Sequence, residues 1–298
     1  MSSLAEQAVD AINATSGRHP GFRAVHAKGR VCAARFEPSG LAADLTTAQH
    51  MREPVTATVR FSNASGDPSA HDRLHARGMA VKFHLPAGGD TDIVAVTLGR
   101  FIVRTPEQFV QLNRTLRPGN GGLPRPSLGT VWFLLRNPDL IKPIGDARSV
   151  EPVVSYAACH FNALHAFRWI DSSGAERHVR YGWEPAASVE SLADTAPKNA
   201  ERDYLQDEIA ERLRLGPVHF TLRVQIAGER DRLDDPTAIW KEPLTVEAGT
   251  LAVERIEDSV VEPLVFDPTR LTAGIELSAD PILRFRPDAY DVSVNRRT

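Results

Sequence analysis

An arginine and a tyrosine near the end of the sequence have the types and the spacing for iron-binding chemistry. Asp280 and Pro281 are typical of an N-cap and a first helical position, so a helix is expected to begin there. On that helix Arg286 and Tyr290 stand four residues apart and share one face. A cation beside a phenol favours the phenolate, which is a hard anionic ligand for ferric iron. Pro287 is expected to kink the helix.

The same spacing is also common in ordinary amphipathic helices, where an arginine and a tyrosine simply share the solvated face. Taken alone, the spacing of Arg286 and Tyr290 therefore favours an ordinary amphipathic helix over an iron-binding site. The elements and motifs in the rest of the chain have to decide between the two.

The composition is typical of a globular protein with a large core. The 298 residues are 42% hydrophobic and 24% charged. A formal net charge of -3 gives no reason to expect nucleic acid or an anionic membrane as partner. No apolar run approaches the ~20 residues that span a bilayer. The two distant cysteines form no metal-type pair, and the first residues lack the pattern of a signal peptide, so we expect a cytoplasmic protein.

Hydrophobic periodicity and turn residues predict an alternation of strands and helices. The expected strands cover 31–36, 55–61, 78–85, 92–98, 163–170, 177–183, 218–226 and 244–253. The expected helices cover 4–13, 46–51, 106–116, 128–136, 138–144, 200–214 and the segment that begins at Asp280. This pattern predicts an α+β fold, with an antiparallel eight-stranded barrel and inserted and C-terminal helices. Without a linker or repeat, we expect residues 1–298 to form a single domain.

Five segments strengthen the functional interpretation because they follow one another in a fixed order. They are Arg23–Gly29 (RAVHAKG), Val59–Ser62 (VRFS), Arg77–Phe83 (RGMAVKF), Asp92–Arg104 and Gly274–Tyr290. Together they resemble the haem-binding segments of the monofunctional catalases. The sequence ends eight residues after Tyr290. We therefore expect a protein similar to the small catalase-related peroxidases, which keep only the haem-bearing barrel and its helices.

The resemblance implies a role for each matching residue. His26 would be the acid/base that takes a proton from a bound peroxide and returns it to the leaving oxygen. Ser62 would orient the His26 imidazole. Tyr290 would ligate the iron of haem b, with Arg286 keeping the phenol deprotonated. The positions that would pair with the haem propionates are Arg23, Arg60 and Arg297. The positions that would line the pocket are Val25, Phe101 and Phe109, for which simple core packing is the alternative.

One departure from the family pattern bears on the substrate. The family keeps an asparagine beside the distal histidine, and the matching position here is Val96. Valine cannot donate a hydrogen bond to hydrogen peroxide, and the adjacent Thr97 is expected to face the other side of its strand. We therefore expect weak catalase activity and a preference for organic hydroperoxides.

Several functions stay open on the sequence alone. The leading interpretation is a haem peroxidase that uses organic hydroperoxides or hydrogen peroxide and small organic electron donors. The alternatives are a compact true catalase, a fatty-acid hydroperoxide lyase or isomerase similar to the allene oxide synthases, and a haem-binding or apolar-ligand barrel without turnover. Val25 precedes the distal histidine, where we understand the allene oxide synthases to carry a threonine. The family habit and the apolar helices of the middle third favour a homodimer.

Overall fold

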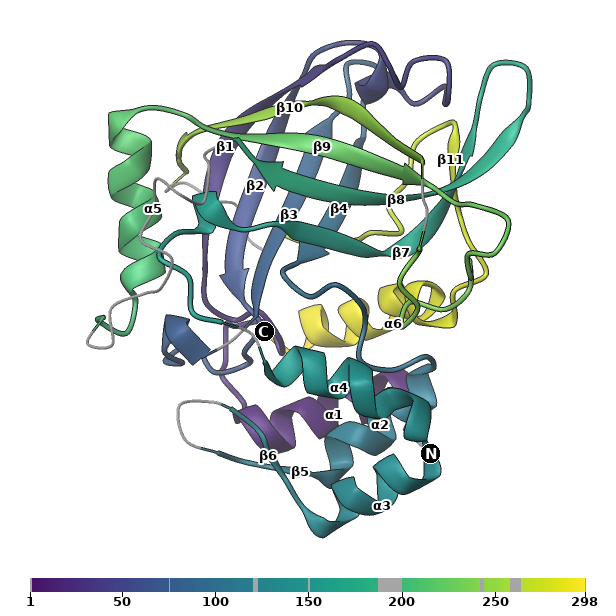
Figure 1. The fold of residues 1–298 in the computed structure, drawn as a ribbon. Helices are drawn as coiled ribbons and strands as arrows, with labels where there is room; N and C mark the ends of the chain where they lie inside the picture. The colour runs from purple at the N-terminus through teal and green to yellow at the C-terminus, as the bar shows by residue number, and fades with distance from the viewer. Residues whose placement is uncertain are drawn as a thin grey trace.

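A closed antiparallel barrel forms the centre of the fold (Figure 1). The computed structural model describes residues 2–74, 76–119, 123–149, 151–186, 200–241, 244–257 and 264–297. Within them the barrel has eight strands: β1 (Gly29–Pro38), β2 (Val55–Asn63), β3 (Arg77–His84), β4 (Asp90–Val96), β7 (Phe161–Ile170), β8 (Glu176–Pro185), β9 (Val218–Ile226) and β10 (Leu244–Ile256). Their order is β7-β4-β3-β2-β1-β10-β9-β8, and pairing of β7 with β8 closes the ring. The short strand β11 (Ile275–Leu277) extends the sheet beside β7.

Alternation along the strands separates the inner face of the barrel from the outer face. Alternate residues of β2 and β3, such as Phe61 and Phe83, are fully buried in the main hydrophobic core. Aromatic rings fill that interior, with Phe36 edge-on to Phe83 at 5.3 Å between centroids. The residues between them, which include Ser62, consequently point outward toward the helices.

Helices cover one end of the barrel (Figure 1). This layer consists of α1 (Leu4–Ser16), α2 (Pro106–Thr115), α3 (Leu128–Arg136), α4 (Ile141–Arg148) and α6 (Pro281–Asn295), while α5 (Tyr204–Leu215) lies at the side of the barrel. Several helices begin at side-chain caps, because Ser3, Thr105, Ser127 and Asp280 each accept a bond from a backbone N–H of the first turn. Among the described residues, no helix is long and apolar enough to cross a membrane.

The predicted fold class is confirmed, with differences at several elements. The helix expected over 46–51 is only the 3-10 turn Gln49–Met51, because the Thr46 hydroxyl donates to the carbonyl of Gly274 and accepts from the N–H of Ala48, which occupies this backbone with a tertiary contact. The segment 138–144 divides into a 3-10 turn, Pro138–Leu140, and the start of α4.

Other differences concern element ends and short strands. Helix α5 begins at Tyr204, four residues after the expected start. The strands β5 (Leu116–Arg117), β6 (Arg125–Pro126) and β11 were not predicted, since two or three residues are too few to show alternation. Helix α6 begins as predicted, with Asp280 as N-cap, and its assigned helical span continues through Pro287.

Candidate active site

The sequence-predicted pair His26 and Ser62 lies together on the outer face of the barrel. His26 is in the segment between α1 and β1, and its Nδ1 lies 2.9 Å from the hydroxyl oxygen of Ser62 on β2. It has φ +57° and is the one non-glycine residue in the described part of the chain with positive φ. Such a conformation is unfavourable for a side chain with a Cβ and persists where its surroundings fix it. The ring orientation of His26 is thus set by Ser62 and the local backbone.

Gly78 on β3 provides the space that the His26 ring occupies. A Cβ atom at Gly78 would lie 2.7 Å from Cε1 and 2.8 Å from Nδ1 of His26, and 2.8 Å from Oγ of Ser62. All three distances are shorter than real contacts to a Cβ atom. Sequence analysis included Gly78 only as part of a motif and missed this role, because the close approach depends on strand register.

Val96 lies next in the same row of outward-facing residues. The ladders pair Ser62 with Gly78 and Gly78 with Val96, and directly opposite residues of antiparallel strands share a face. Val96 is therefore one strand from the glycine under the His26 ring. The Thr97 hydroxyl accepts a 3.1 Å bond from the N–H of Arg77, so it serves the backbone of β3.

A polar side chain that sequence analysis did not single out follows Val96 in this row. Asn162 on β7 is paired with Val96, and its Nδ2 donates a 3.2 Å bond to the carbonyl of Leu98. The backbone of Asn162 therefore lies two strands away from that of Gly78, at roughly 10 Å for a strand spacing of about 4.8 Å.

Helix α6 carries the second predicted pair. Nη1 of Arg286 donates a 2.8 Å hydrogen bond to the phenol oxygen of Tyr290, so the two residues interact as the helical spacing predicts. A buried hydrogen-bonded pair lies at the start of the same helix. His165 Nδ1 is 2.6 Å from Oδ2 of Asp280, whose Oδ1 caps α6 by accepting from Ile282 and Leu283.

Burial and the nearby charge of Arg286 lower the pKa of His165 to about 4, although the hydrogen bond to Asp280 opposes the shift. His165 is therefore neutral near neutral pH. Sequence analysis missed this residue because β7 has a register shift between Ala163 and Phe167, which interrupts the alternation on which burial is predicted. The identified N-cap Asp280 was the one available signal that a partner should lie nearby.

The three arginines that the resemblance assigned to propionates lie around one cavity. Arg23, Arg60 and Arg297 all line a hollow of about 310 Å³ beside the first residues of β1. Arg60 donates a 3.2 Å bond to the carbonyl of Ala27, and Arg23 donates to the carbonyl of Leu264. Three guanidinium groups at one cavity make a strongly basic site that suits carboxylates.

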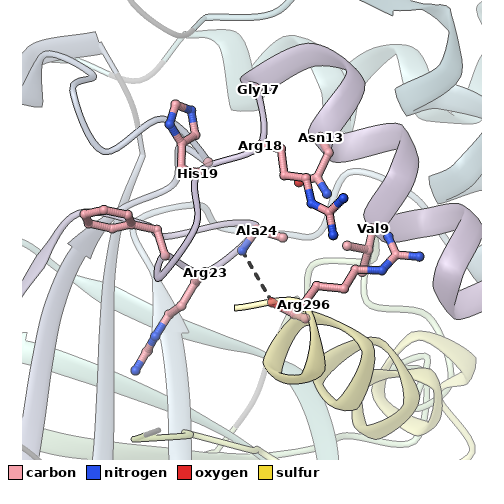
Figure 2. Close-up of a pocket in the computed structure, with 11 residues that line it drawn as sticks. Val9, Asn13, Gly17, Arg18, His19, Arg23, Ala24 and Arg296 are labelled. Carbon is pink, nitrogen blue, oxygen red and sulfur yellow. Dashed lines mark hydrogen bonds between the residues drawn. The ribbon is translucent and has the colours of Figure 1, made fainter. Parts of the chain in front are cut away.

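The segment that carries His26 is tied directly to α6. The N–H of Ala24 donates a 3.4 Å bond to the Ser293 hydroxyl at a small cavity between α1 and α6, which Figure 2 shows together with Arg23 and Arg296. The N–H of Gly21 donates a 3.1 Å bond to the carbonyl of Arg297. These contacts fix the His26 segment relative to the helix of Tyr290.

The predicted lining residues are partly buried near these groups. Phe101 stacks on Phe109 at 6.4 Å between ring centroids and lies 5.8 Å from the ring of His165. Both phenylalanines pack against the smaller hydrophobic cluster of the helical layer. Val25 precedes His26 and is also partly buried. An apolar wall therefore adjoins the polar pairs.

Comparison with known proteins shows the family of this chain. The family model described as catalase matches residues 9–298. The chain belongs to the catalase family. A catalase-related peroxidase of Mycolicibacterium paratuberculosis is 42% identical over 98% of this chain and 94% of its own. A catalase-related peroxidase of Synechococcus elongatus is 28% identical over 98% of this chain and 88% of its own.

Longer catalases share the fold. A solved structure of a fungal catalase superposes with a TM-score of 0.77 at 22% identity, covering 94% of this chain and 60% of that chain. Catalases are haem-dependent enzymes, and the relatives place this protein among the oxidoreductases that act on peroxide.

The residues present fit a haem. Tyr290 offers a phenol oxygen that already accepts a cationic hydrogen bond from Arg286. The basic cavity of the three arginines suits the two propionates, and the partly buried phenylalanines suit the apolar macrocycle. The two ends of the chain thus supply the Tyr290 phenol, which accepts from Arg286, and the His26 imidazole, which is oriented by Ser62.

Proposed function

We propose that this member of the catalase family is a haem b peroxidase that reduces organic hydroperoxides in preference to hydrogen peroxide. Small organic molecules would supply two electrons, which with two protons convert ROOH to ROH and water. The observation that carries this preference is Val96, one strand from Gly78 and the His26 ring, with the Thr97 hydroxyl engaged by Arg77. A small peroxide beside His26 would find no hydrogen-bond donor in the Val96 side chain.

On the distal side, His26 would move the proton. Its Nδ1 faces the Ser62 hydroxyl, so Nε2 would accept the proton from the peroxide oxygen and later return it to the departing oxygen. Ser62 would hold the ring in this orientation. An imidazole that first accepts and then returns a proton must keep its orientation between the two proton transfers. The contact to Ser62 and the space left by the missing Cβ of Gly78 support such a fixed orientation.

Tyr290 would bind the iron of the haem. The haem supplies the redox chemistry when it is bound. The guanidinium of Arg286, which donates to the phenol oxygen, would favour its anionic form, and the charge of Arg286 also acts on the neutral His165. Arg23, Arg60 and Arg297 would hold the propionates, and the residues that would line the pocket are Val25, Phe101 and Phe109.

The first test exchanges the residue that carries the preference. Val96→Asn restores an amide at the distal wall, and we expect oxygen release from hydrogen peroxide to rise at least ~10-fold per haem, since one oriented donor contributes ~10²–10³ in rate. Val94→Asn is the matched control, because Val94 lies two residues along the same face of β4, opposite Ala80. An equal rise in both variants, or none in Val96→Asn, would contradict the assignment.

The second test asks whether turnover exists. The protein reconstituted with haemin should oxidise a chromogenic donor with an alkyl hydroperoxide and release little oxygen from hydrogen peroxide. His26→Ala should keep the Soret band and lose donor oxidation by ~10²–10⁴-fold. Vigorous oxygen release by the unaltered protein would instead favour a compact catalase. Rearranged hydroperoxide products formed without a donor would favour a lyase or isomerase.

The remaining parts of the proposal concern the whole protein. We keep residues 1–298 as one domain, because the layer with α6 and the barrel together hold the candidate site. A homodimer and a cytoplasmic location stay predictions. Size-exclusion chromatography with light scattering would measure the first, and fractionation of cells would measure the second.

A further inference from the structure

The apolar face of helix α3 is exposed to solvent. Leu128, Val131, Trp132 and Leu135 follow the i, i+3, i+4, i+7 pattern and share one face, which is normally the buried one. Here Leu128 is 83% exposed, Trp132 62% and Leu135 65%. The buried residues of the helix, Thr130 and Phe133, face the other way. We call the four exposed residues, together with the exposed Ile141 at the start of α4, the α3 stripe.

The α3 stripe lies at the outer edge of the helical layer. Figure 1 shows α3 at the end of the molecule that is remote from the barrel. The candidate active site lies between the barrel wall and α6, so the stripe is not part of it. No function described above uses these side chains.

Basic side chains lie close in the sequence to the residues of the α3 stripe. The exposed ones are Arg125, Arg136, Lys142 and Arg148, and within the described part of the chain none of them forms an ion pair with a carboxylate. The two acidic residues between positions 125 and 148 form ion pairs with arginines that precede this segment. Asp139 pairs with Arg104 at 2.8 Å, and Asp146 pairs with Arg100 at 2.5 Å. This surface therefore carries a positive excess, although the whole chain has a net charge of -3.

We propose that the α3 stripe binds the surface of an anionic phospholipid membrane. An apolar helix face with a tryptophan fits the boundary between head groups and acyl chains, where the helix would lie in the plane of the interface. Lysine and arginine side chains at its edge would reach the lipid phosphates, with the aliphatic part of each side chain along the apolar surface. The charge is complementary to an anionic surface, and the exposed leucines supply the apolar contact.

A second copy of the chain fits this surface less well. In a two-fold symmetric dimer the same patch meets itself, so the basic edges of both copies would face one another. A standard protein interface also uses roughly 20–30 residues a side, whereas the α3 stripe is one face of a short helix. The membrane surface satisfies both the apolar face and its charged edge.

Flotation of the holoprotein with vesicles tests this proposal. Vesicles of phosphatidylcholine with phosphatidylglycerol should carry the protein upward at low salt, while vesicles of phosphatidylcholine alone should carry much less. The double variant Leu128→Ser, Leu135→Ser should weaken binding at least ~10-fold, since each leucine loses its contribution to the apolar contact. Leu215→Ser is the matched control, because Leu215 is 91% exposed at the end of α5, far along the chain from the stripe.

A second pair of measurements separates the apolar contact from the charge. Lys142→Glu with Arg148→Glu should weaken binding to the anionic vesicles and reduce its dependence on salt. Tryptophan emission should shift to the blue on vesicle binding, and this shift should be lost in Trp132→Phe. All these side chains are exposed, so the thermal unfolding midpoint should not change and would confirm that each variant is folded.

Three outcomes would overturn the proposal. The first is no preference for anionic vesicles at low salt. The second is an equal loss of binding in Leu215→Ser. The third is a dimer in solution that Leu128→Ser with Leu135→Ser converts to a monomer, which would assign the α3 stripe to a second copy instead.

Discussion

The two sides of the candidate site are built in opposite ways. On the distal side the His26 ring is placed by the contact to Ser62, by a positive φ and by the missing Cβ of Gly78, whose space the ring occupies. On the proximal side Tyr290 and Arg286 follow ordinary helical spacing, and a buried pair of His165 and Asp280 anchors the start of their helix.

This contrast indicates which substitutions the His26 side and the Tyr290 side should each tolerate. The distal geometry depends on the lack of a Cβ atom at Gly78, so adding a methyl group there should damage it most. The proximal geometry depends on polar partners that are present, so removing one of them should damage it most. Four predictions, taken from the largest expected effect to the smallest, test this contrast.

The largest effect is expected for Gly78→Ala. The new Cβ would lie 2.7 Å from the His26 ring and must displace it, and a shift of about 1 Å at a reacting group costs ~10² in rate. We expect peroxidase turnover to fall ~100-fold or more while the Soret band is kept. Gly145→Ala on α4 is the control, because nothing lies within 4 Å of its new Cβ. Unchanged turnover in Gly78→Ala would mean that His26 is not the catalytic base.

The proximal counterpart is Asp280→Ala. This change removes the cap of α6 and leaves the Nδ1 of buried His165 without its partner. We expect the free energy of unfolding to fall by about 2–4 kcal/mol, the sum of a lost cap and an unsatisfied buried group. Asp280→Asn keeps an oxygen for the helix N–H groups and should cost less. Chemical denaturation measures both variants, and equal losses would show that the contact of the carboxylate with His165, and not the helix cap, carries the stability.

Acid should weaken the protein through its buried histidines. Burial lowers the pKa of His165 to about 4 and that of His50, beside Phe83 in the barrel, to about 3. Both pKa values are lowered, so the unfolded chain binds the protons first. Their contribution to stability is complete above about pH 6.5 and is lost as the pH falls toward 4 and 3, with a slope of up to ~1.4 kcal/mol per pH unit for each.

Two variants test how much of this pH dependence of the unfolding free energy comes from His50 and how much from His165. His50→Leu should flatten the dependence of the unfolding free energy on pH and leave the haem spectrum unchanged, because His50 is remote from the site. His165→Gln should flatten the slope and also alter the spectrum, since it replaces the imidazole near Arg286, which donates to Tyr290. A slope that both variants retain would place the acid sensitivity elsewhere.

The smallest effect is expected for Ser62→Ala. It removes one hydrogen bond from His26 and adds no atom, so the ring keeps its space above Gly78. A neutral hydrogen bond is worth about 0.5–1.5 kcal/mol, which predicts a fall of roughly 2- to 10-fold in peroxidase turnover. Steady-state kinetics across the pH range would measure it. A loss as large as that of Gly78→Ala would show that Ser62 does more than orient the ring.

Local patterns were enough to predict the barrel, most helix positions and the pairing of Arg286 with Tyr290 on α6. The alternation of β2 and the N-cap at Asp280 depend on a few neighbouring residues, and such signals are readable in the chain. The role of Gly78 and the burial of His165 were not predictable, because one depends on the register of three strands and the other on a bulge. The net charge of -3 likewise gave no sign of the basic residues near the α3 stripe, because a net charge does not show how charges are distributed.

The position of the two pairs along the chain has a consequence for biosynthesis. During translation the segment with His26 leaves the ribosome early, whereas α6 with Tyr290 is among the last parts of this sequence to appear. Until α6 and the following Arg297 emerge, the nascent barrel has His26, Gly78 and two of the three cavity arginines but not Tyr290. Stable uptake of the cofactor should therefore follow the emergence and packing of α6, and a chain truncated before Pro281 should accumulate without a tyrosinate-type spectrum.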